Sequence, residues 1–357
     1  MSISTFEVNN VIFRKFISTL VKTNVIMQLK LKGKDISLIG KDLVVDLHRE
    51  IPVNLYKYFS ISSYSIDNLI ENKIHFSHPF KLNDIMEGSS QLWDLNDFIG
   101  QYVSETSRPY LDVLTLVTQH FPEEVYQHRG VLCLTEDFNN NLFWPHYTSE
   151  LGFCIEFNSN DFLKSLEHEK IICFPMDYEI LQTINFNDYI FREELSGKVE
   201  VNAQLPLTYA LAVKDKIWAY EKEWRIILTK KDLGKISHPL HIINQEQYLA
   251  ELKGLVNRNI PYDRQCINRI ILSTLFFSNS RFANKIKVNN NTTEYYFREG
   301  NKDLFQFLLE LQQNYNDKVF QIDRDIIEGE IVSKINYRIK IIYLSEKYVS
   351  IESEKLF

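Results

Sequence analysis

The eight-residue segment Trp218–Arg225 constrains the fold most strongly, because acidic and basic side chains recur there at every second position among aromatic ones. In an extended strand, Glu221, Glu223 and Arg225 would share one face, with successive side chains about 6.5 to 7 Å apart. Two carboxylates at that spacing suit acid–base chemistry or the stabilisation of a cation. The alternative is an amphipathic strand whose charges are solvated and partly paired, each pair contributing about 0 to 1 kcal/mol.

The chain length bounds the domain organisation. At 357 residues it exceeds the roughly 250 to 300 at which a single core stops growing, so additions to one large domain or two modest domains are expected. Pro52 marks a boundary. We predict a small N-terminal module over residues 1–50, a main α+β domain over 51–280, and a C-terminal helix plus β-hairpin extension over 281–357.

Hydrophobic periodicity predicts an α+β fold whose core is a mixed or antiparallel sheet with helical insertions. Strands are expected over residues 27–47 (several short ones), 54–59, 74–77, 130–135, 152–157, 220–226 and 267–275, with a terminal hairpin or meander over 330–351. Helices are expected over residues 6–21, 65–73 (capped by Ser65), 209–216 and 303–315, and within a mostly helical region over 90–128. A loop containing Trp144 is expected to join strands 130–135 and 152–157.

Composition excludes several classes of protein. The net charge of −7 argues against a strong nucleic-acid signal, which requires concentrated Lys and Arg. Lys30, Lys32 and Lys34 alternate with leucines and are expected on the solvated side of a strand. The four cysteines include no Cys-x-x-Cys pair, so neither a zinc ribbon nor a disulfide framework is indicated. No apolar run approaches the 18 residues of a membrane span, so a cytoplasmic protein without a membrane partner is expected.

Four separated motifs occur in a specific order within residues 52–275. They are Leu55-Tyr56-Lys57-Tyr58; Phe76-Ser77-His78-Pro79 followed by Asn83, Asp84 and Glu87; Leu134-Thr135-Glu136 followed by Trp144, His146 and Tyr147; and Trp218–Arg225. Together they resemble a bacterial family known as domain of unknown function 2971. That resemblance implies no activity, because a family name alone does not fix a function.

A more distant resemblance is to ADP-ribosyltransferases, whose catalytic strand often carries a Glu-x-Glu pair like that of Glu221 and Glu223. It implies an ADP-ribosyltransferase-like fold and NAD as the consumed substrate. Expelling nicotinamide from NAD builds positive charge on the ribose, which a fixed carboxylate stabilises. Glu223 would bind the ribose 2′-hydroxyl and Glu221 would orient or deprotonate the acceptor, while Tyr58 or Tyr147 would stack on the nicotinamide ring.

Other candidate residues lie in the same motifs. His146, between aromatic neighbours, is a candidate catalytic donor or base, or alternatively a hydrogen-bonded side chain of a packed loop. Asp84 precedes a helix and is more simply a cap, with Glu87 beside the helix N-terminus. No metal-ligand spacing is present, and the Cys133 thiol lies in an apolar strand, where thiols are inert. The candidate ligand-binding residues are Tyr56, Lys57, Tyr58, Ser77, Asn83, Trp144, Tyr147 and Arg225.

Three functions remain open from the sequence. The first is an NAD-consuming transferase or glycohydrolase, acting on an unidentified acceptor macromolecule as a toxin or antiphage effector. The second is a non-catalytic module that binds a nucleotide or a protein in bacterial defence. The third is a metal-dependent nuclease that uses Asp84, Glu87 and Glu221 around the ion. The absence of a Gly-x-Gly pair and of a Walker A loop argues against redox use of NAD and ordinary phosphoryl transfer.

Overall fold

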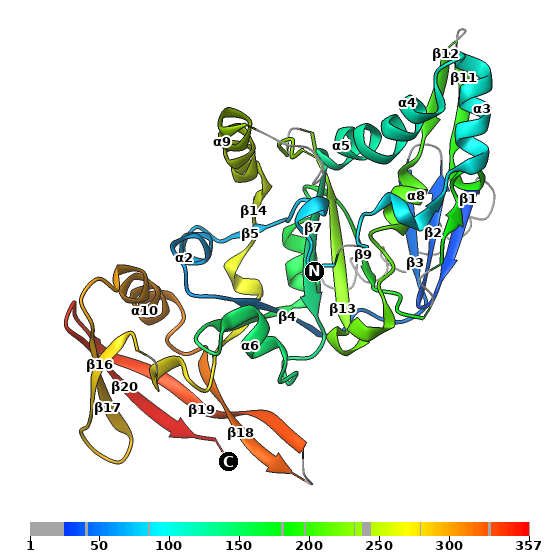
Figure 1. The fold of residues 1–357 in the computed structure, drawn as a ribbon. Helices are drawn as coiled ribbons and strands as arrows, with labels where there is room; N and C mark the ends of the chain where they lie inside the picture. The colour runs from blue at the N-terminus through cyan, green and yellow to red at the C-terminus, as the bar shows by residue number, and fades with distance from the viewer. Residues whose placement is uncertain are drawn as a thin grey trace, which may run out of the picture.

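A computed structural model describes residues 25–39, 42–84, 86–179, 182–195, 198–231, 233–237, 244–278, 280–327 and 330–356. Over these ranges the protein is an α+β structure built on one large mixed sheet, which confirms the predicted fold class (Figure 1). The helix expected over residues 6–21 lies outside the described part of the chain. Among the helices that are described, none has the combined length and apolar character that a membrane crossing requires.

The main sheet has eleven strands in the order β16-β17-β20-β19-β18-β15-β8-β4-β7-β13-β9. Their bounds are β4 Asn54–Phe59, β7 Arg129–Thr135, β8 Phe153–Asn158, β9 Lys170–Pro175, β13 Glu223–Thr229, β15 Ile267–Leu272, β16 Phe282–Lys287, β17 Thr292–Phe297, β18 Val319–Ile327, β19 Glu330–Leu344 and β20 Tyr348–Lys355. The β15–β18 ladder is parallel and the other ladders of this sheet are antiparallel. The strands predicted over residues 54–59, 130–135, 152–157 and 267–275 are all members of it.

Smaller sheets and short helices surround the main sheet. The small sheets pair β1 (Val25–Leu31), β2 (Lys34–Ile39) and β3 (Asp42–Leu47); β5 (Lys73–His75) and β14 (Asn259–Pro261); β6 (Trp93–Asp94) and β10 (Ile184–Asn185); and β11 (Phe191–Leu195) and β12 (Lys198–Asn202). The α-helices are α2 Ser63–Ile70, α3 Asn96–Thr106, α4 Tyr110–Thr115, α5 Phe121–Tyr126, α6 Phe143–Thr148, α7 Ser159–Ser165, α8 Gln204–Tyr209, α9 Gln245–Gly254 and α10 Lys302–Asn314. Two short 3₁₀ helices, η1 (Pro79–Lys81) and η5 (Lys216–Glu221), also border the pocket described below.

Hydrophobic clusters pack on both faces of the sheet, and β13 contributes to each. Trp224 and Ile226 enter a cluster that also holds residues of α2, α7 and α10. Ile227 enters a second cluster, formed with α3, α4, α5, α8 and the N-terminal strands. Because side chains alternate along a strand, Glu223 and Arg225 lie on the same side of β13 as Ile227.

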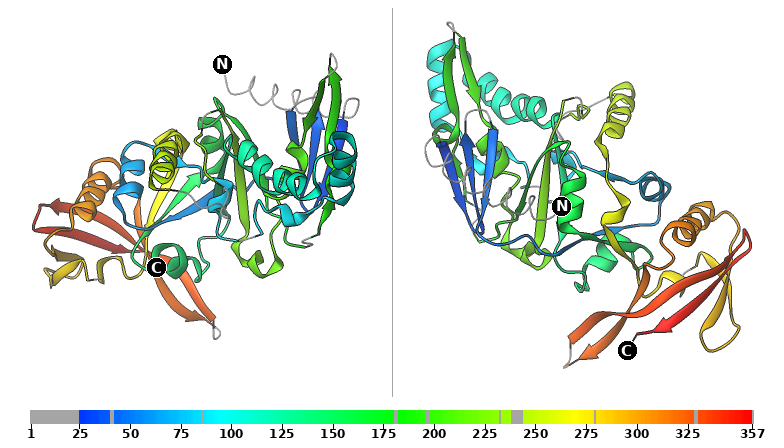
Figure 2. Two further views of the ribbon diagram at one scale, coloured as in Figure 1. Left: turned by 45° about the horizontal axis from the view of Figure 1, so that its top comes forward. Right: turned by 180° about the vertical axis from the view of Figure 1, so that it is seen from behind.

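The molecule is elongated, with different segments at its two ends (Figures 1 and 2). Strands β16 to β20 and helix α10 form one end, and strands β1 to β3 with helices α3 to α5 form the other. The C-terminal strands join the main sheet through the β15–β18 ladder. The division into three segments at residues 50 and 280 stays a prediction.

The strands predicted within residues 27–47 are present, but the expectation that all three lysines there are solvated is wrong for Lys34. Its side chain is fully buried, and its Nζ donates hydrogen bonds to the carbonyls of Pro175 (2.6 Å) and Ala212 (3.2 Å). The ammonium also lies 5.0 Å from the centre of the Phe174 ring. The alternation of lysines and leucines could not reveal this burial, because the chain turns at Lys32 and Gly33 and Lys34 begins β2. There it lies on the same side as Ile36 and Leu38, which are also fully buried.

Three local predictions were wrong at their boundaries. Helix α2 is capped by Ser62, whose side chain accepts from the Ser65 amide, so Ser65 is the third helical residue in a capping box. The Trp144 segment was predicted as a loop but contains a six-residue helix, which is too short for its periodicity to be detected. The helix expected over residues 209–216 ends at Tyr209, after which Val213 forms a bridge with Asp177.

Candidate functional site

The main sheet opens between β4 and β7. Strand β4 pairs with β8 along all six of its residues, but with β7 only at Tyr56 and Thr135. Further along β7, Val131 forms a bridge with Ser77 instead. Between these two contacts, the described chain provides no strand partner for Cys133 on this side, and a pocket occupies the gap.

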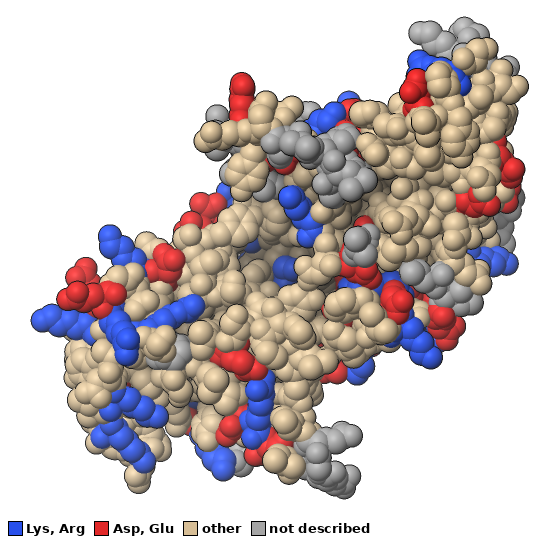
Figure 3. Space-filling model, viewed as in Figure 1, with Lys and Arg blue, Asp and Glu red and all other residues tan. Residues whose placement is uncertain are grey.

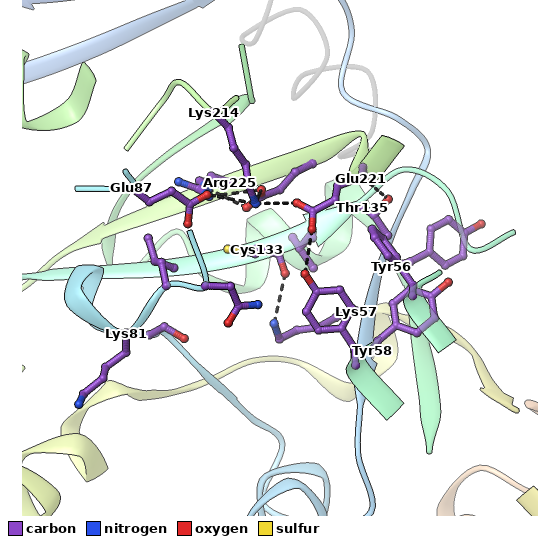
Figure 4. A pocket seen from close by; sticks show the side chains of 17 residues that line it. Tyr56, Lys57, Tyr58, Lys81, Glu87, Cys133, Thr135, Lys214, Glu221 and Arg225 are labelled. Atoms are coloured by element: carbon purple, nitrogen blue, oxygen red, sulfur yellow. Dashed lines mark hydrogen bonds and ion pairs between the residues drawn. The ribbon is translucent and has the colours of Figure 1, made fainter. Parts of the chain in front are cut away.

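The pocket has a volume of about 170 Å³, and the face of the molecule shown in Figure 3 is hollowed near its centre, with Lys or Arg atoms inside the hollow. Ligand pockets typically hold about 300 to 1,000 Å³, so this one suits part of a nucleotide. Charged side chains gather beside β13 and aromatic rings beside β4 (Figure 4). The lining residues are Tyr56, Lys57, Tyr58, Ser77, Lys81, Leu82, Asn83, Glu87, Cys133, Leu134, Thr135, Phe143, Tyr147, Lys214, Glu221, Glu223 and Arg225.

A buried network of five charged side chains forms one wall of the pocket (Figure 4). The Lys214 Nζ lies 2.6 Å from Glu221 Oε2, 3.1 Å from Glu87 Oε1 and 3.3 Å from Glu223 Oε2. The Arg225 guanidinium donates to both oxygens of Glu223, from Nε at 2.6 Å and from Nη2 at 3.2 Å, and also to Glu87. Three carboxylates therefore share two cations, so the network keeps one excess negative charge when all three are ionised.

The network shows that the interpretation of solvated charges is wrong, and so is the interpretation of one continuous strand. Glu221, Glu223 and Arg225 are all buried, at 5% exposure or less. Strand β13 begins only at Glu223, because Glu221 ends the 3₁₀ helix η5 and Lys222 has a positive φ of 44°. The bend at Lys222 brings Glu221 and Glu223 to the same ammonium from different directions.

The two glutamates have opposite pKa shifts. Burial tends to raise the pKa of Glu223, but Arg225 and Lys214 outweigh it and lower that pKa to about 2. Burial and the Glu223 charge raise the pKa of Glu221 above its ordinary value, although Lys214 opposes them. Glu223 is therefore a fixed anion, whereas Glu221 is the carboxylate in the pocket that takes up a proton more readily.

The aromatic wall is attached to the charged network by one hydrogen bond. The Tyr147 hydroxyl donates to Glu221 Oε1 at 2.9 Å. Tyr58 donates to the Phe138 carbonyl at 2.7 Å, and its ring meets those of Phe143 and Trp144 edge-on. These contacts fix the orientation of the Tyr58 ring and hold the Tyr147 hydroxyl beside Glu221.

The segment that holds most of this network matches a known family. Residues 143–226 match the model of a family described as Protein of unknown function (DUF2971). The DUF2971 segment contains Tyr147, Lys214, Glu221, Glu223 and Arg225, so the resemblance predicted from the motifs is confirmed over these residues. No curated protein and no solved structure matches the chain.

Most residues predicted for the site meet in this pocket, from inside and outside the DUF2971 segment. The residues that line it are Tyr56, Lys57, Tyr58, Ser77, Asn83, Tyr147, Glu221, Glu223 and Arg225. His146 is exposed to solvent and does not line the pocket. Trp144 is fully buried behind Tyr58, so its indole packs in the core instead of facing a ligand.

Sequence reasoning missed one member of the network and favoured the wrong role for another. Lys214 is central to it, and the only available signal was a lysine directly after the apolar run of residues 210–213. Glu87 was interpreted as a residue beside a helix N-terminus, but it pairs with Lys214 and Arg225. The predicted cap at Asp84 is wrong: its side chain accepts from the Met86 amide at 3.0 Å within a turn over residues 86–88, and the next helix, η2 (Ser90–Leu92), is capped by Ser89. Cys133 lines the pocket with its pKa raised by burial, as expected for an unreactive thiol.

Two further observations bear on ligands. Over the described ranges, no group of three or more His, Cys, Asp or Glu side chains is arranged to hold a metal ion. Glu223 also lines a second cavity of about 720 Å³. The basic residues of that cavity are Lys32, Arg49, Lys216 and Lys222.

Proposed function

We propose that the pocket binds the nicotinamide riboside part of NAD, or of a related nucleotide, and breaks the glycosidic bond by hydrolysis or by transfer to an acceptor. The observation that supports this proposal is the Glu221 carboxylate, which accepts from the Tyr147 hydroxyl, in a cavity that Tyr56 and Tyr58 also line. Aromatic rings suit a planar nicotinamide, and a carboxylate suits the positive charge that develops on ribose.

The chemistry assigns different roles to the two glutamates. The bond from the ribose C1′ to the nicotinamide nitrogen breaks, and its electron pair leaves with nicotinamide. Water or an acceptor oxygen then bonds to C1′ and loses its proton to Glu221. Glu223 is a positioning residue in this scheme, because both of its oxygens are held by Arg225 and it fixes Lys214 beside Glu221.

The test is nicotinamide release from NAD by the purified protein. We expect Glu221→Gln to lower the rate by about 100-fold or more, as loss of a general base does. Glu71→Gln is the control, because Glu71 is exposed and pairs only with Lys73 on the surface. No release by the wild type with water or with a panel of protein and nucleic-acid acceptors would refute the proposed reaction. If Glu223→Gln folds and loses nicotinamide release while Glu221→Gln keeps it, the catalytic role belongs to Glu223.

Binding without turnover is the second candidate function, and the charge balance of the pocket favours it. Lys214 and Arg225 pair with all three carboxylates, so a ligand would meet carboxylates that already have cationic partners and not a free anion. A nucleotide sensor needs no more than this. NAD that raises the melting temperature but releases no nicotinamide would support this candidate.

A further inference from the structure

Lys57 differs from the other cations deep in the pocket because it has no carboxylate partner. It lies on β4 at the gap in the sheet, and its Nζ donates to the Cys133 carbonyl at 3.2 Å (Figure 4). Among the described residues it forms no ion pair, whereas Lys214 has three and Arg225 has two. An ammonium has three protons to donate, so two of those on Lys57 lack a hydrogen-bond acceptor within the described structure, and its Nζ also lies 5.8 Å from the centre of the Phe59 ring.

The surroundings of Lys57 offer further donors and no free anion. Ser77 and Asn83 line the same pocket, and in the described structure their side chains make no hydrogen bond. Lys81 lies exposed at the rim and extends away from Lys57 in Figure 4, which adds positive charge at the entrance. The cavity therefore combines a partly buried ammonium, a hydroxyl and an amide with an outer lysine.

A partly buried ammonium without a counter-ion is unfavourable, because the loss of water penalises the charged form. Burial accordingly lowers the pKa of the Lys57 amine, while the Glu223 charge acts in the opposite direction without forming an ion pair. An anion beside the amine would remove that penalty. The nearby network cannot supply one, since its carboxylates are already paired with Lys214 and Arg225.

We propose that Lys57, with Ser77 and Asn83, forms a subsite for a phosphate group of the ligand, and that Lys81 attracts this group at the rim. A phosphate suits the site better than a carboxylate, because it carries a larger negative charge and three acceptor oxygens for three different donors. The ligand class is then a phosphorylated nucleoside. This inference rests on the proposed function only in placing the ligand in this pocket.

The experiment compares ligands that differ by one phosphate. Calorimetry at low salt measures the binding of two ligand pairs. One pair is AMP and adenosine, and the other is nicotinamide mononucleotide and nicotinamide riboside. We expect the phosphate to tighten binding by at least about tenfold in one pair, as a charge-assisted hydrogen bond does. Lys57→Met should reduce this preference to less than about threefold, whereas Lys216→Met, in the second cavity, should leave it unchanged.

The outcomes separate this inference from the proposed reaction, because no turnover is needed to measure a phosphate preference. Three outcomes would each overturn the subsite. The first is equal affinity within both ligand pairs, and the second is that none of the four ligands binds. The third is a phosphate preference that is lost in Lys216→Met and kept in Lys57→Met. If Lys57→Met does not fold, Lys57→Gln takes its place, since it keeps a neutral donor for the Cys133 carbonyl. In the wild type, added salt should weaken AMP binding more than adenosine binding, and equal weakening would also count against the subsite.

Discussion

Three carboxylates, those of Glu87, Glu221 and Glu223, lie within 2.6 to 3.3 Å of the Lys214 ammonium. All four side chains are buried, so removing the lysine would leave negative charges facing one another away from water. Breaking a buried ion pair from one side typically costs about 3 to 5 kcal/mol, far more than breaking an exposed pair. The stability of the pocket therefore depends on this lysine more than on any single surface pair.

We predict that Lys214→Met lowers the free energy of unfolding by about 3 to 5 kcal/mol at pH 7, measured by urea denaturation. Lys222→Met is the matched control, because Lys222 pairs with Asp137 at the surface, and a change of about 0 to 1 kcal/mol is expected. Part of the loss should be recovered at low pH, where Glu221 takes up a proton first. Similar effects of the two substitutions would contradict the role given to the network.

At the residue scale, the sequence predicted which side chains belong to the site better than it predicted their partners. Glu221, Glu223 and Arg225 were identified from spacing that assumed a continuous strand, although the chain bends at Lys222. Lys214 could not be identified, because its partners come from two separate segments, one at Glu87 and one at Glu221 and Glu223. His146 was selected for its aromatic neighbours, but its place on a short helix turns it toward solvent.

At the scale of elements, long apolar or alternating runs predicted strands correctly, because such strands bury at least one face in any sheet. Strands β7, β8 and β15 are examples, and their residues fill the clusters on the two faces. Short elements such as α6 were not predicted, since one and a half turns show little periodicity. The gap between β4 and β7 was invisible in the sequence, because it depends on Ser77 replacing β4 as the partner of β7.

The contact between the N-terminal sheet and β9 leads to a prediction about pH. Burial lowers the pKa of Lys34 from 10.5 to about 7, with Asp177 opposing the shift. Between these two values the unfolded chain binds a proton that the folded chain has released. The penalty for burying Lys34 is therefore complete below pH 7 and declines as the pH rises toward 10.5, by at most about 1.4 kcal/mol per pH unit.

Lys34→Met should remove this dependence. We expect the variant to exceed the wild type in unfolding free energy by more at pH 7 than at pH 9, measured by urea denaturation at both values. The comparison is a difference between two proteins, so the titration of tyrosines and other groups cancels. Lys30→Met, at an exposed position of β1, is the control and should show no such change. A difference in unfolding free energy between Lys34→Met and the wild type that stays constant or grows as the pH rises would contradict the lowered pKa of Lys34.

At the scale of the whole molecule, one sheet runs from β9 to β16 and connects segments that the sequence separated at residue 280. Strand β18 pairs in parallel with β15, and helix α10 covers the same hydrophobic cluster that supports β4 and β13. The Phe307 ring of α10 lies 4.6 Å from that of Phe153 on β8, and both side chains are fully buried. The C-terminal segment is therefore part of the support behind the pocket.

We predict that a chain ending at residue 280 does not fold into the same structure, because truncation uncovers β15 and the apolar surface around Phe153. The shortened protein should lose its cooperative thermal transition, followed by circular dichroism, and should aggregate. Within the intact chain, Phe307→Ala should cost about 3 to 5 kcal/mol, as large-to-small core substitutions do. Gln306→Ala, at the exposed neighbouring position, should change stability by less than about 0.5 kcal/mol. A truncated protein with a wild-type melting temperature would show instead that the chain divides at residue 280 into separate folding units.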